Sequence, residues 1–223
     1  HGHIDGVLYP AELSACQGVT TTVGGNCGYS PENLKEFFQF HQKQGFPIHQ
    51  AMLIGHGSPL RNAVGLTDLY QAADRQQIDR MAALAEEALQ EGACGISFGL
   101  DYVPGCTIEE VTALAEIAAK YDRVCAVHTR LLADDDLTSL ADVIQTARQT
   151  GAKMLVSHFV YQYCQGLTEQ ALDMVDQARE QGLPVYIDSG MYTNWTTYFD
   201  TTTFSYENIR NNNWKWEQMI VAT

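Results

Sequence analysis

Four histidines stand out for their spacing and for where they fall along the chain. His1 and His3 begin the chain, and His128 and His158 each close a short apolar run much later. Residues spaced i, i+2 point to the same side of a β-strand. If His128 and His158 end strands of the same sheet, four imidazoles converge, and such convergence usually means a metal site. Taken alone, the N-terminal pair is equally well explained as chance or as the remnant of a tag.

The length and charge of the chain limit its class. Its 223 residues, 45% of them hydrophobic, suffice for one large domain or for most of a barrel of about 250 residues. A net charge of −14 argues against nucleic acid or an anionic membrane as a partner. No apolar run approaches the roughly 20 residues that cross a bilayer. The six cysteines form no Cys-x-x-Cys pair and are too few for a disulfide scaffold, which predicts reduced thiols and a cytoplasmic protein.

Short apolar runs alternate regularly with amphipathic stretches. We predict strands at 19–23, 51–54, 95–98, 124–128, 154–158 and 184–188, and a further strand ending at His3. We predict helices at 30–44, 76–90, 107–120, 139–150 and 168–181. This order implies a parallel sheet, and seven β units indicate an α/β protein with a (β/α)₈ TIM-type barrel that lacks its eighth strand. The alternative is an open doubly wound sheet, which the absence of a G-x-G-x-x-G motif disfavours.

The whole chain, 1–223, is predicted to be one incomplete barrel domain. Residues 193–223 are rich in Thr, Asn, Tyr and Trp without a clean period, and we expect them to form a loop region after strand seven. Active sites of such barrels lie at the carboxyl ends of the strands. The polar residues at or just past the predicted strand ends are His1, His3, Cys27, His56, Asp101, His128, Arg130, His158 and Asp188.

Several motifs along the chain carry a family resemblance. They are 1–5 (HGHID), 18–28 (GVTTTVGGNCG), 55–58 (GHGS), 92–102 (GACGISFGLDY), 128–130 (HTR) and 157–158 (SH). Together they resemble the D-aminoacylase (N-acyl-D-amino-acid deacylase) branch of the amidohydrolase superfamily over essentially the whole chain. The Asn-Cys-Gly and Gly-Leu-Asp-Tyr segments are the most specific of these motifs.

The resemblance implies a zinc site with a cysteine ligand. Most binuclear amidohydrolases bridge their metals with a carboxylated lysine on the fourth strand, but residues 95–100 contain no lysine. The D-aminoacylase branch uses a cysteine after the second strand, where Cys27 stands, and thiolate is a good zinc ligand. By resemblance, Cys27, His128 and His158 hold one tight zinc. His1 and His3 help to hold a second, weaker one.

The implied reaction is hydrolysis of the amide bond of N-acyl-(D-)amino acids or related small amides by metal-activated water. In the family the general base is an aspartate at the end of the eighth strand, which is expected beyond residue 223. The family's N-terminal β-sandwich segment is also missing, so we expect this sequence to be an internal portion of a longer protein.

Specificity is where the chain departs from the family pattern. The family's lysine two residues after the sixth-strand histidine is replaced by Val160. Arg130 and Arg61 are candidates to bind a substrate carboxylate, although a rim salt bridge explains Arg130 equally well, and Tyr192 is a further substrate-binding candidate. Two other functions stay open: a cyclic amidase of the dihydroorotase or hydantoinase type, and a metal-binding barrel without catalytic activity.

Overall fold

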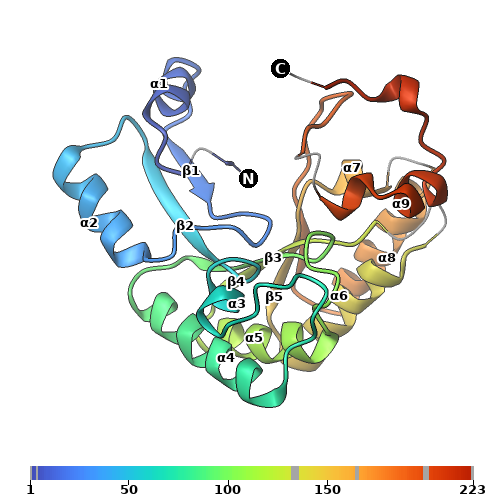
Figure 1. Cartoon of the computed structure of the whole chain (residues 1–223), viewed down its shortest axis with the longest axis horizontal. Coiled ribbons are helices and arrows are strands. Elements are labelled where there is room, and N and C mark those ends of the chain that lie inside the picture. Colours follow the sequence, from blue (N-terminus) through green and yellow to red (C-terminus); the bar gives the residue numbers. More distant parts are fainter. Residues whose placement is uncertain (1, 4, 132–135, 164–165, 198–200, 222–223) are drawn as a thin grey trace.

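Six parallel strands form one sheet in chain order. The computed structural model describes residues 2–3, 5–131, 136–163, 166–197 and 201–221. The strands are β1 (Thr21–Gly24), β2 (His49–Gly55), β3 (Gly95–Gly99), β4 (Val124–His128), β5 (Lys153–Val156) and β6 (Val185–Ile187). Each strand pairs only with its chain neighbours, so that β1 and β6 are the two edges of the described sheet. The predicted α/β barrel architecture is thus present as a half-barrel (Figure 1).

The described residues form helices before, between and after the strands. They are α1 (Leu8–Cys16), α2 (Leu34–Gln44), α3 (Leu60–Ala63), α4 (Arg75–Gln90), α5 (Ile108–Lys120), α6 (Thr138–Thr150), α7 (Phe159–Tyr163), α8 (Thr168–Glu180) and α9 (Tyr206–Asn211). The longer helices α4, α5, α6 and α8 pack on the outer face of the sheet (Figure 1). Two 3₁₀ turns, η1 (Thr202–Phe204) and η2 (Trp216–Gln218), lie in the last segment. No helix in the described part of the chain is long and apolar enough to cross a membrane.

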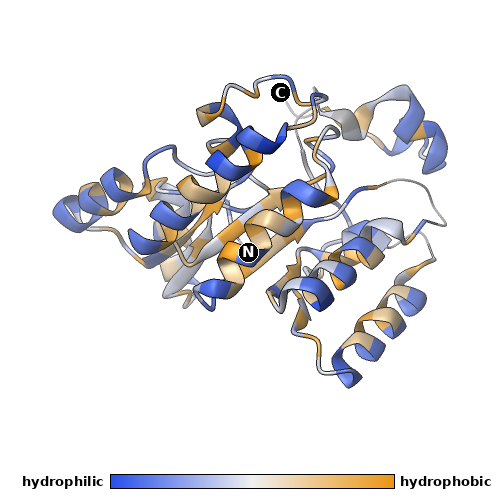
Figure 2. Ribbon diagram, turned by 90° about the horizontal axis from the view of Figure 1, so that it is seen from below, coloured by the Kyte–Doolittle hydropathy of each residue, from blue (hydrophilic) through white to orange (hydrophobic). Residues whose placement is uncertain are grey.

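The alternation of side chains on the strands separates a helix-covered core from the inner face. Ile96 and Phe98 of β3, and Val127 of β4, are buried against the helices in the hydrophobic core. Ser97 and Ala126 point to the opposite face and are also buried. Figure 2 shows hydrophobic residues concentrated in the strands and along one side of the flanking helices. The core therefore fixes which strand residues are left to face the site.

Side-chain caps mark several helix starts. Thr107 caps α5 as predicted, because its hydroxyl accepts a hydrogen bond from the backbone N–H of Glu110. The start predicted at residue 30 is wrong, since α2 begins at Leu34 with Asn33 as its cap. Ser30 serves another purpose: its Oγ accepts a hydrogen bond from Gly55 N, 3.0 Å away, at the end of β2.

Three further expectations differ from the structure. The predicted strand ending at His3 is not formed among the described residues. The backbone at Gly2 nevertheless lies beside β1, because Gly2 N donates a hydrogen bond to Val23 O at 3.1 Å. Strand β5 ends at Val156, two residues before His158. The region 193–223 is not only a loop, because α9 and two 3₁₀ turns form within it.

A buried ion pair ties α3 to α5. The guanidinium of Arg61 donates from Nη1 to both carboxylate oxygens of Glu110, at 2.7 and 3.0 Å, and all of these side chain atoms are fully buried. His56 Nε2 lies 2.6 Å from the same carboxylate. His56, Cys106 and Glu110 are close enough together to hold a metal ion. Because Arg61 already neutralises the carboxylate, we assign this cluster a structural role.

We predict that Glu110→Ala lowers the free energy of unfolding by about 3–5 kcal/mol, because it leaves the Arg61 guanidinium buried without its counter-charge. Urea denaturation measures the loss. Glu116 is an exposed residue on the same helix, and Glu116→Ala should change the free energy of unfolding by no more than about 0.5 kcal/mol. Similar small losses in the two variants would contradict the structural role.

The same carboxylate also makes stability depend on pH. Burial raises the pKa of Glu110, but hydrogen bonds from His56 and Arg61 and the charge of Arg61 outweigh it, so the pKa lies below its ordinary value of 4.5. Such a group contributes stability above its unfolded pKa and loses it as pH falls through its folded pKa. The free energy of unfolding of the wild-type chain, measured as a function of pH, should therefore fall below about pH 4.5. Glu110→Gln should lack this part of the decrease.

Candidate metal centre

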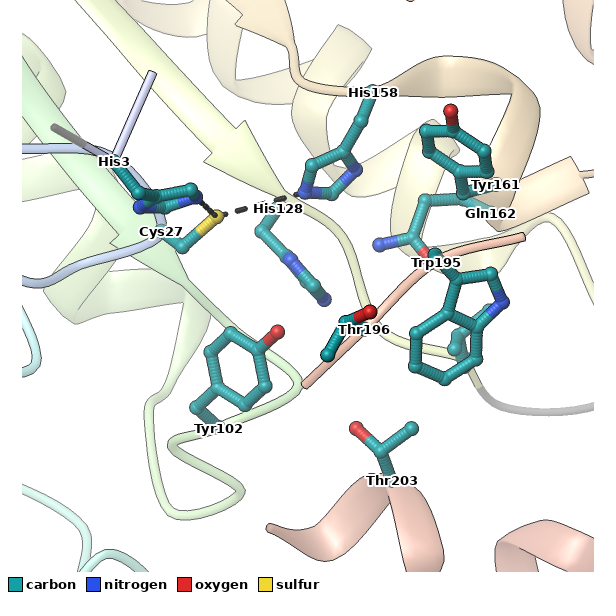
Figure 3. A pocket seen from close by; sticks show the side chains of 11 residues that line it. His3, Cys27, Tyr102, His128, His158, Tyr161, Gln162, Trp195, Thr196 and Thr203 are labelled. Atoms are coloured by element: carbon teal, nitrogen blue, oxygen red, sulfur yellow. Dashed lines mark hydrogen bonds between the residues drawn. The ribbon is translucent and has the colours of Figure 1, made fainter. Parts of the chain in front are cut away.

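A pocket at the carboxyl end of the sheet brings three predicted ligands together. Cys27 lies in the loop after β1, His128 ends β4, and His158 lies in the turn after β5 (Figure 3). Their candidate ligand atoms all lie within 4.8 Å of one another. Cys27 Sγ is 3.5 Å from His158 Nε2, and the centroids of the two imidazole rings are 4.5 Å apart.

The N-terminal histidines are only partly accounted for. His3 lines the same pocket, with its Nε2 3.9 Å from Cys27 Sγ. His1 lies outside the described residues. The placement of His3 beside the thiol supports its inclusion among the candidate ligands, while the contribution of His1 stays a prediction.

The loop after β1 holds the Cys27 thiol in the pocket with an uncommon backbone conformation. Cys27 has φ 56° and Gly28 has φ 81°, and a non-glycine residue with positive φ is rare and often functional. Across from the loop, a Cβ on Gly99 would lie 2.1 Å from the backbone oxygen of Cys27. Only glycine at position 99 permits this close approach between the loop and the end of β3.

Ser97, on the inner face of β3, holds the loop through two hydrogen bonds. Its hydroxyl donates to the backbone oxygen of Gly25 and accepts a hydrogen bond from Gly28 N at 3.0 Å. Asn26 adds two hydrogen bonds from its amide nitrogen, to Gly2 O at 2.9 Å and to Val23 O at 2.7 Å. The residues on either side of the thiol are therefore held by side chains, and sequence analysis missed the role of Ser97.

Asp188, just after β6, holds the turn that carries His158. Its side chain accepts a hydrogen bond from the backbone N–H of His158, which has φ 39°. Its backbone oxygen accepts from Phe159 N at 2.8 Å, and its own N–H donates to Val156 O at 3.1 Å. Asp188 thus bridges the ends of β5 and β6 and supports a residue in a strained conformation.

Burial keeps both imidazoles neutral at physiological pH. Burial, followed by the nearby charges of His158 and His3, holds the pKa of His128 well below its ordinary value. Burial also lowers the pKa of His158 to about 4, although the Asp188 carboxylate opposes that shift. Neutral imidazole is the form of histidine that binds metal ions.

The donor atoms fit a zinc ion. Among the described residues, neither ring nitrogen of His128 has a hydrogen-bond partner, although its side chain is buried. Buried polar atoms are almost always satisfied, so an unsatisfied imidazole beside a thiol points to a missing ligand. Burial, then the charges of Asp188 and Asp5, raises the pKa of Cys27 to about 12. A cation reverses that cost, and two nitrogens with one thiolate are a donor set that suits zinc.

The last segment of the chain completes the pocket. The walls include aromatic and polar residues that sequence analysis did not assign to the site: Tyr102, Tyr161, Gln162, Trp195, Thr196 and Thr203. The ring of Tyr102 lies 4.6 Å, centroid to centroid, from that of His128. The position of Tyr102 in the Gly-Leu-Asp-Tyr motif could have identified it as a site residue, whereas nothing in the local sequence marks Trp195.

None of the three predicted substrate-binding residues lines the pocket in the described structure. Arg130 turns its guanidinium to the backbone oxygen of Cys106, 2.6 Å away. The side chain of Tyr192 is 78% exposed. Arg61 is fully buried in its ion pair, so its predicted contact with substrate does not agree with its position. The prediction failed for Arg61 because the single turn of α3 directs it toward α5.

The known proteins to which the chain is similar include several deacylases. No protein-family model matches the chain. An N-acyl-D-glutamate deacylase of Alcaligenes xylosoxydans xylosoxydans is 29% identical over 88% of this chain and 46% of its own length. The crystal structure of N-acyl-D-glutamate deacylase from Bordetella bronchiseptica, complexed with zinc and a phosphonate mimic of the tetrahedral intermediate, has a TM-score of 0.76 and 30% identity, covering 86% of this chain and 46% of that one.

A structure of D-aminoacylase described for its binuclear metal centre is 25% identical, with a TM-score of 0.75 over 86% of this chain and 46% of that one. The chain therefore spans about half the length of these relatives. The resemblance predicted from the motifs is confirmed.

We predict that Ser97→Ala lowers zinc affinity by about 10- to 100-fold, because the loop that carries Cys27 loses its central hydrogen bonds. Competition with a chelator measures the dissociation constant. As a control, Thr146→Ala removes a buried hydroxyl that donates to Asp142 O, 2.8 Å away, on the remote helix α6. It should reduce stability without changing zinc affinity, and unchanged affinity in Ser97→Ala would show that the loop needs no such support.

Proposed function

We propose that this chain, whose sequence and fold are similar to the D-aminoacylase branch of the amidohydrolase superfamily, forms the metal site of a zinc-dependent hydrolase. The substrates are N-acyl-(D-)amino acids or related small amides, cleaved at the amide bond. The observation that carries the proposal is the convergence of Cys27, His128 and His158, whose ligand atoms lie within 4.8 Å of one another beside a pocket.

In the proposed site, two groups of residues bind zinc with different strengths. Cys27, His128 and His158 hold one zinc tightly, while His3, 3.9 Å from the thiol, and His1 contribute to a weaker second position. When bound, zinc supplies an activated water as nucleophile and polarises the amide carbonyl. Because Ser97 and Asp188 fix the backbone around the ligands, the site is formed before substrate arrives.

Tyr102 is placed to contact the substrate. Its ring lines the pocket next to His128, and burial raises its pKa, which keeps the phenol protonated. A protonated phenol at the pocket wall can donate a hydrogen bond to a substrate oxygen. Among the described residues we assign no general base, and the expected aspartate stays a prediction.

The cyclic amidase alternative is less well supported. Its carboxylated lysine would have to come from β3, whose inner face carries the buried Ser97, already engaged with Gly25 and Gly28. These hydrogen bonds hold the loop that carries Cys27 against this serine, which supports the proposal that the cysteine serves in place of a carboxylated lysine.

We predict about one tightly bound zinc per chain, lost in Cys27→Ala, because the two remaining imidazoles hold the ion far less well. Elemental analysis after dialysis gives the metal content, and circular dichroism checks folding. Cys125→Ala is the matched control, because Cys125 is equally buried but faces the helices in the hydrophobic core. A Cys27→Ala variant that keeps its zinc would contradict the proposed ligand set.

The catalytic proposal is tested, in a protein that also supplies the aspartate expected as general base, by release of free amine from paired N-acetyl-D- and N-acetyl-L-amino acids. We expect zinc-dependent hydrolysis that disappears in Cys27→Ala and persists in Cys125→Ala. Binding of zinc without hydrolysis of any linear amide would instead favour a metal-binding barrel without catalytic activity.

A further inference from the structure

The wall of the pocket farthest from the ligands is an aromatic cluster built by the last segment of the chain. Trp195 stacks on Phe204, with centroids 6.0 Å apart and planes 17° apart. Trp214 packs against the same indole at 5.6 Å. Figure 3 shows the Trp195 ring on the side of the pocket opposite Cys27 and His3. The indole is therefore supported from behind and presents its remaining surface to the pocket.

The segment is anchored to the sheet by a buried hydrogen bond. The hydroxyl of Thr203, which is 2% exposed, donates to Asp101 Oδ2 at 2.6 Å. Asp101 also accepts a hydrogen bond from Leu131 N at 3.3 Å. Because Asp101 follows β3 and Leu131 lies beyond β4, this contact sets the aromatic cluster above the strands that carry the site.

The walls described for this pocket carry no lysine or arginine side chain. The guanidinium of Arg130 donates to Cys106 O, and that of Arg61 is enclosed by Glu110. Apart from the proposed metal ligands, the walls of the pocket carry three aromatic side chains and a few uncharged ones: Tyr102, Tyr161, Trp195, Leu131, Gln162, Thr196 and Thr203.

We propose that this pocket selects amides whose acyl group is uncharged and aromatic, and that Trp195 is the residue that determines this preference. The inference rests on the proposed function, since it concerns the substrate of the same site. A carboxylate against these walls would lose its hydration without gaining a cation as partner. An aromatic ring gains contact area and favourable ring packing against the supported indole.

Three hydroxamates that share one zinc-binding group test the proposal by binding rather than by turnover: benzohydroxamate, acetohydroxamate and succinomonohydroxamate. The full chain is loaded with zinc, its metal content is measured, and each dissociation constant is determined by calorimetry. We expect benzohydroxamate to bind at least about 10-fold more tightly than the carboxylate-bearing succinomonohydroxamate.

Substitutions locate the preference. Trp195→Ala should weaken benzohydroxamate about 3- to 10-fold and leave acetohydroxamate unchanged. Trp195→Arg should shift the preference toward succinomonohydroxamate, because it supplies the missing cation. Trp216→Ala is the control, since Trp216 is 57% exposed and lies outside the pocket walls; it should leave all three constants unchanged.

The outcomes separate this inference from the proposed function. Zinc binding with equal or tighter binding of the carboxylate-bearing probe in the wild-type chain would overturn the inference and leave the metal site standing. Equally tight binding of benzohydroxamate to the wild-type chain and to Trp195→Ala would also overturn the inference and leave the metal site standing. Folded wild-type chain that binds no zinc would overturn the proposed function together with the inference.

Discussion

Close backbone packing between the loop after β1 and the end of β3 is the constraint on which the site depends. A side chain at Gly99 would collide with the backbone of Cys27, and Ser97 joins the same two segments by hydrogen bonds. In the β3–β4 pair, Gly99 lies opposite His128. The contact that places the thiol therefore also places it over the strand that carries the imidazole, so the ligands are positioned by backbone geometry.

The interior holds two buried polar clusters that are satisfied in different ways. Glu110 meets the charge of Arg61 and a hydrogen bond from His56, so its carboxylate is stable within the protein. His128 has no such partner among the described residues, and the Cys27 thiol is held where burial opposes its ionisation. The Glu110 carboxylate is balanced by protein groups alone, whereas a Cys27 thiolate in the proposed metal site needs the charge of a cation.

The segment after β6 forms a wall of the pocket that the strands do not supply. The proposed metal ligands come from the strand ends and their loops, where the register of the sheet fixes them. The opposite wall comes from Trp195 and its aromatic neighbours, anchored through Thr203. A division of this kind lets one arrangement of ligands serve different substrates, because the loop wall can change without disturbing the sheet.

The sequence by itself determined the alternation of strands and helices and the positions of Cys27, His128 and His158 near strand ends. These features are local, and parallel strands necessarily bring their carboxyl ends to one edge. Only the tertiary structure decided that Arg61 is enclosed by Glu110, that Ser97 supports the cysteine loop, and that Trp195 closes the pocket. Each of these depends on contacts between residues far apart in the chain, and no local period or motif encodes which distant group a side chain will meet.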